Sequence, residues 1–226
     1  MADPRSQVEH EEEDGASAGE LLIEACRRNN TDLLADVISS CGGEEKAAEV
    51  LNNTKTVLGN YIYHEAALRG NYEVIDMLLD QEGFECDPIN TREGDTPLHS
   101  AIRFINSLPP TPPSPDNEPS AAYNLISMML EAGSDASIRN KANLTAVQLL
   151  DPRNVELKRL FQEAAEEAER EREIAGLEAE EHEEEALEDD YAGSGSDSDF
   201  DPEEFKRQQE EKKKELAELK AAKAEA

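Results

Sequence analysis

Apolar residues gather between residues 21 and 161 and recur there with the spacing of short amphipathic helices. Two segments share one pattern, in which an apolar residue is followed by two spacers and an apolar pair. The matching residues are Ile75, Leu78 and Leu79 in the first segment and Ile126, Met129 and Leu130 in the second. This spacing puts the apolar side chains on one face of a helix. The pattern therefore predicts helices that pack on a shared core.

The segments that precede these helices repeat as well. GNYIYHEAALRG at 59–70 and GDTPLHSAIR at 94–103 match at Gly, His, Ala and Arg, with an offset of 35 residues. A weaker copy, LLIEACRRNNTDLLADVI, covers 21–38, and a fourth, NKANLTAVQLLDPRNVELKRLF, covers 140–161. Four copies of a helix-turn-helix unit, with a period near 33 residues, indicate a repeat protein whose units stack on one another.

The period and the motif Gly94-x-Thr96-Pro97-Leu98-His99 resemble the ankyrin-repeat family over residues 18–162. The resemblance implies an all-α ankyrin-repeat solenoid of about four repeats, at 18–52, 53–89, 90–139 and 140–162. The residues to which we assign a structural role in these repeats are Gly59, His64, Gly70, Gly94, Thr96, Pro97, Leu98 and His99.

The motif has a physical basis at the start of a helix. The Thr96 hydroxyl can accept a hydrogen bond from a first-turn amide, and Pro97 fits the first helical position because its missing N–H has no partner to lose. The resemblance implies that His99 bonds to the backbone of the neighbouring repeat. The second copy has Tyr61-Ile62 at the Thr-Pro position, and the fourth has Gln148 in place of the histidine. Such a departure is expected in the fourth copy, because terminal copies of a repeat protein are often atypical.

A proline cluster, NSLPPTPPSPDNEPSA at 106–121, interrupts the third repeat. His99 and Gln148 are 49 residues apart, 16 more than one period, and proline cannot continue a helix. We interpret the cluster as an insert between the two helices of this repeat, tolerated because the cost of closing a loop grows slowly with its length. Thr111-Pro112 and Ser114-Pro115 leave open a docking or kinase site within it. A shorter insertion is expected at 39–52.

Charge divides the chain in another way. The sequence has 53 Asp and Glu against 22 Lys and Arg, a formal charge of −31. Residues 1–17 are predicted to be a disordered acidic terminus, and 163–201 an acidic low-complexity tail, disordered or a single helix. Asp201 and Pro202 are typical of a helix start and predict a charged helix over 202–226. Ser194, Ser196 and Ser198 resemble sites for an acid-directed kinase.

Candidate chemistry is sparse. Three cysteines without CxxC spacing suggest neither a zinc site nor a disulfide framework, and no nucleophile motif or phosphate loop is present. We therefore expect no enzyme activity, no cofactor and no metal. An acidic chain is a poor ligand for nucleic acid. The absence of a long apolar run argues against a membrane span. We expect a monomer that is cytoplasmic, nuclear or both.

By resemblance, the chain would bind a protein partner through the tips of its turns and the exposed face of its inner helices. The candidate contact residues are Arg27, Arg28, Asn60, Leu68, Arg69, Arg92, Asp95, Arg103, Phe104, Arg139 and Lys141. Arginine recurs at matching places in three repeats, which predicts a basic column for an acidic partner segment or for the protein's own acidic tail. The alternative is that these arginines complement the carboxyl ends of their helices.

Two functions remain open. The chain resembles small fungal ankyrin proteins with an acidic tail, among them a yeast protein of unassigned role and, more distantly, a ribosomal-protein chaperone. This resemblance implies an escort for a basic client such as a ribosomal protein or histone, with the acidic tail neutralising the client. The alternatives are an ankyrin scaffold or regulatory subunit controlled by phosphorylation of the tail, and a tail that only solubilises the chain.

Overall fold

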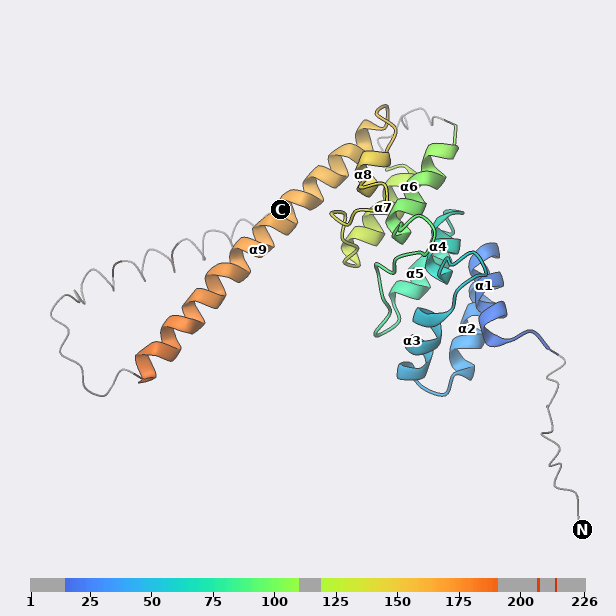
Figure 1. The fold of residues 1–226 in the computed structure, drawn as a ribbon, viewed down its shortest axis with the longest axis horizontal. Helices are drawn as coiled ribbons and strands as arrows, with labels where there is room; N and C mark the ends of the chain where they lie inside the picture. The colour runs from blue at the N-terminus through green and yellow to red at the C-terminus, as the bar shows by residue number, and fades with distance from the viewer. Residues whose placement is uncertain (1–14, 110–118, 191–206, 208–213, 215–226) are drawn as a thin grey trace, which may run out of the picture. The chain divides into compact units, whose positions relative to one another are not determined.

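The structure, a computed structural model, describes residues 15–109 and 119–190 together with Arg207 and Lys214. The chain consists of two compact units, residues 1–161 and 162–226. The described ranges contain helices and no extended strand (Figure 1). The helices are α1 (Ala18–Arg28), α2 (Thr31–Ser40), α3 (Glu44–Asn53), α4 (Ile62–Ala67), α5 (Tyr72–Leu79), α6 (Pro97–Ser107), α7 (Ala121–Glu131), α8 (Ala146–Leu149) and α9 (Val155–Asp190). The all-α repeat fold predicted from the sequence is confirmed.

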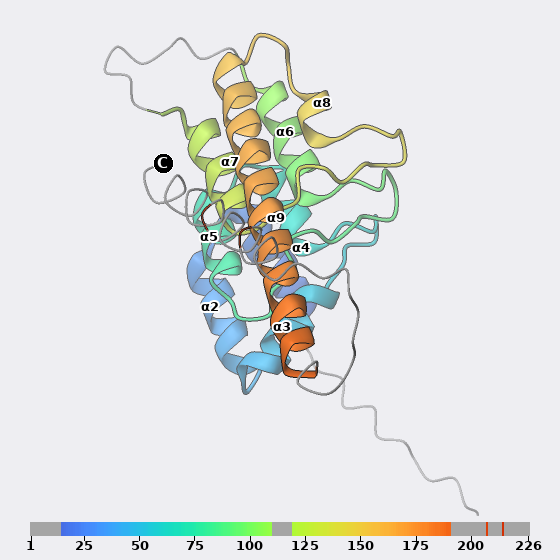
Figure 2. The same cartoon turned by 90° about the vertical axis from the view of Figure 1, so that its left-hand side faces the viewer.

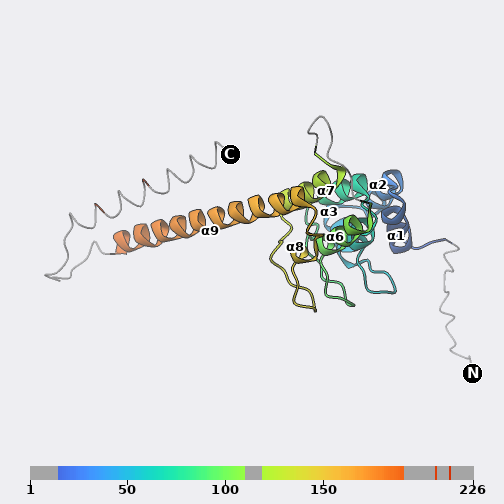
Figure 3. The ribbon, with the colours of Figure 1, turned by 90° about the horizontal axis from the view of Figure 1, so that it is seen from above.

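The helices of the first unit form two layers. The inner helices α1, α4, α6 and α8 pack in succession, and the outer helices α2, α5 and α7 pack behind them (Figure 2). A hairpin precedes each of α4, α6 and α8, and the three hairpins project to the same side (Figure 3). The first residues of α9 complete the core with Leu157 and Phe161. Each repeat thus buries an apolar face that it could not cover alone.

Local sequence explains where the helices begin. Ser17, Thr96 and Thr145 each open a helix in a capping box, with Glu20, His99 and Gln148 as the respective partners. These side chains satisfy amides that have no acceptor within the helix. Between α1 and α2 the chain reverses at Asn29, which adopts a left-handed conformation (φ 55°), as asparagine does more readily than most residues.

The structure differs from the sequence predictions at two places. The insertion expected at 39–52 contains a helix, α3, whose residues Ala47 and Leu51 are buried. Helix α6 continues to Ser107 and α7 begins at Ala121, so the interruption is narrower than 106–121. Val155 begins α9 and is 71% exposed, whereas Leu157, Leu160 and Phe161 of the same helix are buried.

Several predictions fall on residues outside those described. They concern 1–14, the centre of the proline insert at 110–118, Ser194, Ser196 and Ser198, and 202–226 apart from Arg207 and Lys214, which are helical.

The second unit begins within α9. Residues 162–190 contain fifteen Asp and Glu and only two Arg, and they form a helix. Alanine, glutamate, leucine and arginine favour a helix by intrinsic propensity, and Arg170 Nε donates to the Glu166 carbonyl at 3.4 Å. No helix in the described part of the chain is long and apolar enough to span a membrane.

Candidate functional site

Each hairpin is closed by one backbone hydrogen bond across its base. The bonds run from Thr56 N to Asn60 O (2.8 Å), from Asn90 N to Asp95 O (3.0 Å) and from Asn140 N to Leu144 O (3.0 Å). One residue before each acceptor lies in the left-handed region: Gly59 (φ 81°), Gly94 (φ 70°) and Asn143 (φ 61°). The sequence therefore places glycine or asparagine, the residues that adopt a positive φ most readily, at these three positions.

The hairpins are fastened to one another. Thr91 N donates to Gly59 O at 3.3 Å, and Lys141 N donates to Glu93 O at 2.9 Å. Their tips differ in character, because Val57 is fully exposed at the first tip, whereas Arg92 and Lys141 occupy the next two. The result is an ordered row of backbone loops with varied side chains, which is the kind of surface on which a repeat protein can build specificity.

The two repeat histidines bridge neighbouring repeats. His64 Nε2 lies 2.8 Å from Asp95 O, and His99 Nε2 lies 3.0 Å from Leu144 O. Thr96 Oγ1 contacts His99 Nδ1 at 2.8 Å, whereas the Nδ1 of His64 has no hydrogen-bond partner among the described residues, since Tyr61 stands at the threonine position. Burial lowers the pKa of His64, although the bond to Asp95 partly opposes this shift. Both histidines hold repeats together.

The predicted arginine column is paired with buried carboxylates. Arg27 Nε donates to Glu65 Oε2 at 2.9 Å, and Arg69 Nη1 donates to the same oxygen at 3.0 Å and to the Glu65 carbonyl at 2.8 Å. Asn60 Nδ2 donates to Glu65 Oε1 at 3.1 Å. Burial alone would raise the pKa of Glu65, but the bonds from Arg27 and Asn60 and the arginine charges outweigh it and lower the pKa.

A second carboxylate repeats this arrangement one unit later. Arg103 Nε donates to Asp95 Oδ2 at 2.7 Å, and Asn140 Nδ2 donates to Asp95 Oδ1 at 2.8 Å. Burial opposes ionisation of Asp95, yet the bonds from Arg103 and Asn140 lower its pKa. Arg27, Arg69 and Arg103, which we call the arginine strip, are each 40–45% exposed and face two compensating negative charges.

This geometry corrects one predicted contact residue. Asp95 was expected at a binding tip, but its side chain is 3% exposed, so it holds the arginine strip and cannot meet a partner directly. Arg28 pairs with Glu24, and Arg92 pairs with Glu93. The remaining candidates, Asn60, Leu68, Arg69, Arg103, Phe104, Arg139 and Lys141, are half-buried or exposed on the inner helices and hairpins.

The outer helices, together with α3 and the loops that follow α5 and α7, carry a feature that sequence reasoning missed. Segments 31–53, 71–89 and 119–138 contain one base, Lys46. Their exposed acids, which we call the acidic outer face, are Asp32, Asp36, Glu44, Glu45, Glu49, Glu73, Asp76, Asp80, Glu82, Glu85, Glu131 and Asp135. The other bases of the repeats lie on the inner helices, the turns that follow them, the hairpins and the start of α9. Counting charge helix by helix within each repeat would have found this segregation.

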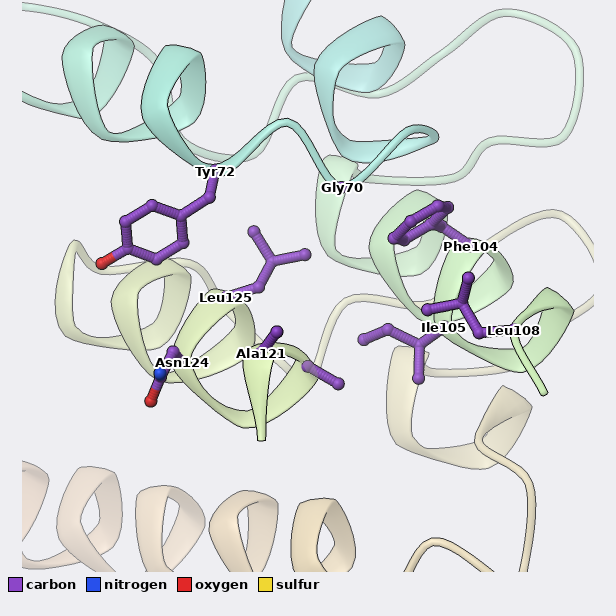
Figure 4. Close-up of a pocket in the computed structure, with 9 residues that line it drawn as sticks. Gly70, Tyr72, Phe104, Ile105, Leu108, Ala121, Asn124 and Leu125 are labelled. Atoms are coloured by element: carbon purple, nitrogen blue, oxygen red, sulfur yellow. The ribbon is translucent and has the colours of Figure 1, made fainter. Parts of the chain in front are cut away.

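An apolar hollow lies where α6, α7 and the end of α4 meet. We call it the junction groove; its volume is about 370 Å³, and its lining is Gly70, Tyr72, Phe104, Ile105, Leu108, Ala121, Ala122, Asn124 and Leu125 (Figure 4). Sequence reasoning selected Phe104 and Gly70 but not the α7 wall. No sequence signal marked that wall, because the proline insert separates it from α6.

Catalytic and metal chemistry find little support in the described residues. No group of three or more His, Cys, Asp and Glu side chains that could hold a metal ion is found among them. Burial raises the pKa of the Cys26 thiol to about 12, so this cysteine is not a reactive thiolate. The features that remain are an ordered, charge-segregated surface and one groove.

Comparison with known proteins agrees with the geometry. A family model described as ankyrin repeats, in three copies, matches residues 22–109. The ankyrin repeat-containing protein YGL242C of Saccharomyces cerevisiae is 40% identical over 139 residues, which cover 61% of this chain and 71% of that protein. Ankyrin repeats form extended surfaces that bind other proteins. The chain therefore belongs to the ankyrin-repeat family and is a protein–protein interaction module.

Proposed function

We propose that this protein escorts a basic client, such as a ribosomal protein or histone, in the cytoplasm or nucleus. The repeats would hold one client segment while acidic surfaces neutralise the rest. The observation that carries the proposal is the segregation of charge. The acidic outer face holds twelve exposed carboxylates beside Lys46, and residues 162–190 add fifteen acids to two arginines.

Physical chemistry favours a basic partner for such a surface. Many like charges create a potential that attracts oppositely charged proteins and speeds their association. The attraction extends over about 8 Å at physiological salt, the Debye length, so charges spread over several helices act on a large client together. The side chains of Glu166, Glu169 and Glu173 on α9 are exposed, as such contact requires.

The scaffold alternative depends on the arginine strip and on the tail serines. Glu65 and Asp95 already supply the strip with two buried negative charges, which weakens its attraction for an acidic segment. Control by phosphorylation at Ser194, Ser196 and Ser198 stays a prediction. We therefore rank the escort function first.

The test compares three full-length baits: the natural chain, a variant with the six glutamates between 163 and 173 changed to Gln, and a control with the same six changed to Asp. Proteins captured from a lysate are identified by mass spectrometry, and the major client is then purified and titrated against each bait. Because aspartate keeps the charge, we expect the Asp control to retain affinity and the Gln variant to lose about tenfold.

Raised salt should weaken binding of the natural chain and have less effect on the Gln variant. The escort function is rejected if the major partner is acidic or neutral, or if all three baits bind it equally at every salt concentration. Equal binding would instead favour a scaffold that works through the repeats alone.

A further inference from the structure

In each repeat a connection joins the inner helix to the outer helix. At two of the three junctions between repeats, hydrogen bonds link this connection to the neighbouring repeat. Between the first and second repeats, Val74 N donates to Asn29 Oδ1 at 3.2 Å and Asn71 Nδ2 donates to Cys26 O at 2.6 Å. Between the third and fourth, Asn106 Nδ2 donates to Leu149 O at 2.7 Å, and Asn106 Oδ1 accepts from Asp151 N at 3.0 Å. These bonds close the space between successive connections.

The junction of the second and third repeats lacks such ties in the part of the chain that the structure describes. The described ends of the connection between α6 and α7 are Leu108 and Ala121, and neither makes a hydrogen bond to the short turn at Gly70 among the described residues. Phe104 occupies part of the gap, because a Cβ at Gly70 would lie 2.1 Å from Phe104 Cε1. The junction groove lies beside this ring.

The groove is apolar but accessible. Tyr72 is 40% exposed and Leu108 is 45% exposed, and Asn124 offers an amide at its edge. Figure 4 shows the rings of Tyr72 and Phe104 on opposite sides, with Leu125 between them. Aromatic walls of this kind accept a bulky side chain from an extended partner, and the polar group fixes its orientation.

Charge around the groove is unequal. Asp76 follows Tyr72 by one helical turn on α5 and its carboxylate is exposed, whereas the carboxylate of Glu73 accepts a hydrogen bond from Asn29 of the first repeat. Glu156 contacts Ser120 Oγ at 2.8 Å at the start of α7. On the inner side, Arg69 and Arg103 stand beside Gly70 and Phe104, but each pairs with a buried carboxylate. The uncompensated charge at the groove is therefore negative.

We propose that the junction groove binds one bulky apolar side chain of an extended client segment whose neighbouring residues are Lys or Arg. The apolar residue enters between Tyr72, Phe104 and Leu125, and the basic residues face Asp76 and the rest of the acidic outer face. This inference rests on the proposed function and names the part of the client that the repeats recognise.

A displayed library of random peptides, selected on the full-length protein, tests the proposal. Ala121→Trp fills the groove from the exposed first residue of α7, and Leu108→Ser removes an exposed wall. Ala35→Trp, at an exposed position on α2, is the matched control. Thermal unfolding first establishes that each variant folds, and peptides enriched on the natural chain are then measured by fluorescence anisotropy.

We expect the enriched peptides to share an apolar residue flanked by Lys or Arg. Their affinity should fall about tenfold with Ala121→Trp and with Leu108→Ser, as when an interface anchor is lost, and stay unchanged with Ala35→Trp. Acidic peptides, uncharged proline-rich peptides, the absence of enrichment, or equal binding to all variants would each overturn the proposal. Purely basic peptides that ignore Ala121→Trp but weaken with the six glutamines on α9 would also overturn it, while leaving the escort function in place.

Discussion

Gly70 combines two constraints in one residue. Its φ of +63° lies in the left-handed region, and Phe104 fills the space that a side chain would need. We expect Gly70→Ala to lower the free energy of unfolding by about 2–4 kcal/mol, of which backbone strain contributes about 1–2 kcal/mol and displacement of the ring the remainder. Chemical denaturation of the purified variant measures the change.

Gly42→Ala separates the two causes. Gly42 has a φ of +75°, but nothing lies within 4 Å of an added Cβ. This variant should therefore lose only the strain, about 1–2 kcal/mol. Equal losses in the two variants would mean that the contact between Gly70 and Phe104 contributes nothing to stability.

His64 makes stability depend on pH. Burial holds its folded-state pKa below the ordinary value of 6.5, so the unfolded chain takes up the proton first. The contribution of His64 to stability is complete above pH 6.5 and is lost as the pH falls through the folded pKa. We expect the natural chain to unfold more easily at about pH 5.5 than at about pH 7.5, a range that spans the usual histidine titration.

The control for this pH effect is His64→Gln, which keeps an amide donor near Asp95 O but does not titrate. Its stability should change less over the same range. Glu65 and Asp95 have lowered pKa values and lose their contributions only in stronger acid, below their ordinary 4.5 and 3.8. The same pH response in both proteins would exclude His64 as its source.

Individual residues show how far the sequence could predict the site. Thr96 and Pro97 were assigned from local rules, because capping depends on residues close together in the sequence. The role of His99 came from the resemblance to the ankyrin-repeat family. The pairing of Arg69 and Arg103 with Glu65 and Asp95 could not be assigned in this way. The arginines could be seen to recur, but burial of their partners depends on how the repeats stack. The basic column was therefore predicted without its counter-charges.

At the scale of elements, the many negative charges of α9 reduce the stability of this helix. Glu163 and Glu167, and Glu169 and Glu173, are four residues apart, and like charges at this spacing destabilise a helix. We expect the helix content of 162–190 to rise when the pH is lowered to about 4 or when salt is raised to about 0.5 M, since both reduce the repulsion. Backbone chemical shifts of the full chain report this directly.

The variant with the six glutamates changed to Gln provides the comparison. It should already show the higher helix content at neutral pH and respond little to salt. If neutralisation instead melts the helix, then attractive pairs such as Glu166 with Arg170 dominate in α9, and the repulsion described above is unimportant.

Elements also differ in how predictable they were. The paired helices of each repeat follow from apolar spacing, because burial selects one face. Helix α3 was expected only as an insertion. Its length could be derived from the repeat period, but its docking through Ala47 and Leu51 depends on contacts with other elements. The junction groove was missed for the same reason, since its two walls are separated by the proline insert.

For the folded repeats as a whole, the separation of charge matters more than its total. The repeat motifs place arginines at the ends of inner helices, where buried carboxylates hold them, while the outer helices carry acids that the core does not need. A client approaching the repeats therefore meets two different faces. The net charge of −31 alone predicts that the protein attracts a basic client, but it does not predict which face of the repeats the client meets.

The proline insert between α6 and α7 has an evolutionary consequence. The groove walls are Tyr72, Phe104, Leu125 and their neighbours on the helices, including Leu108 and Ala121, which are the described residues at the two ends of the insert. Because loop closure depends weakly on length, residues can be gained or lost between these ends without moving either helix. Selection can thus change the sequence and length of the insert independently of the groove residues, although both belong to the same repeat.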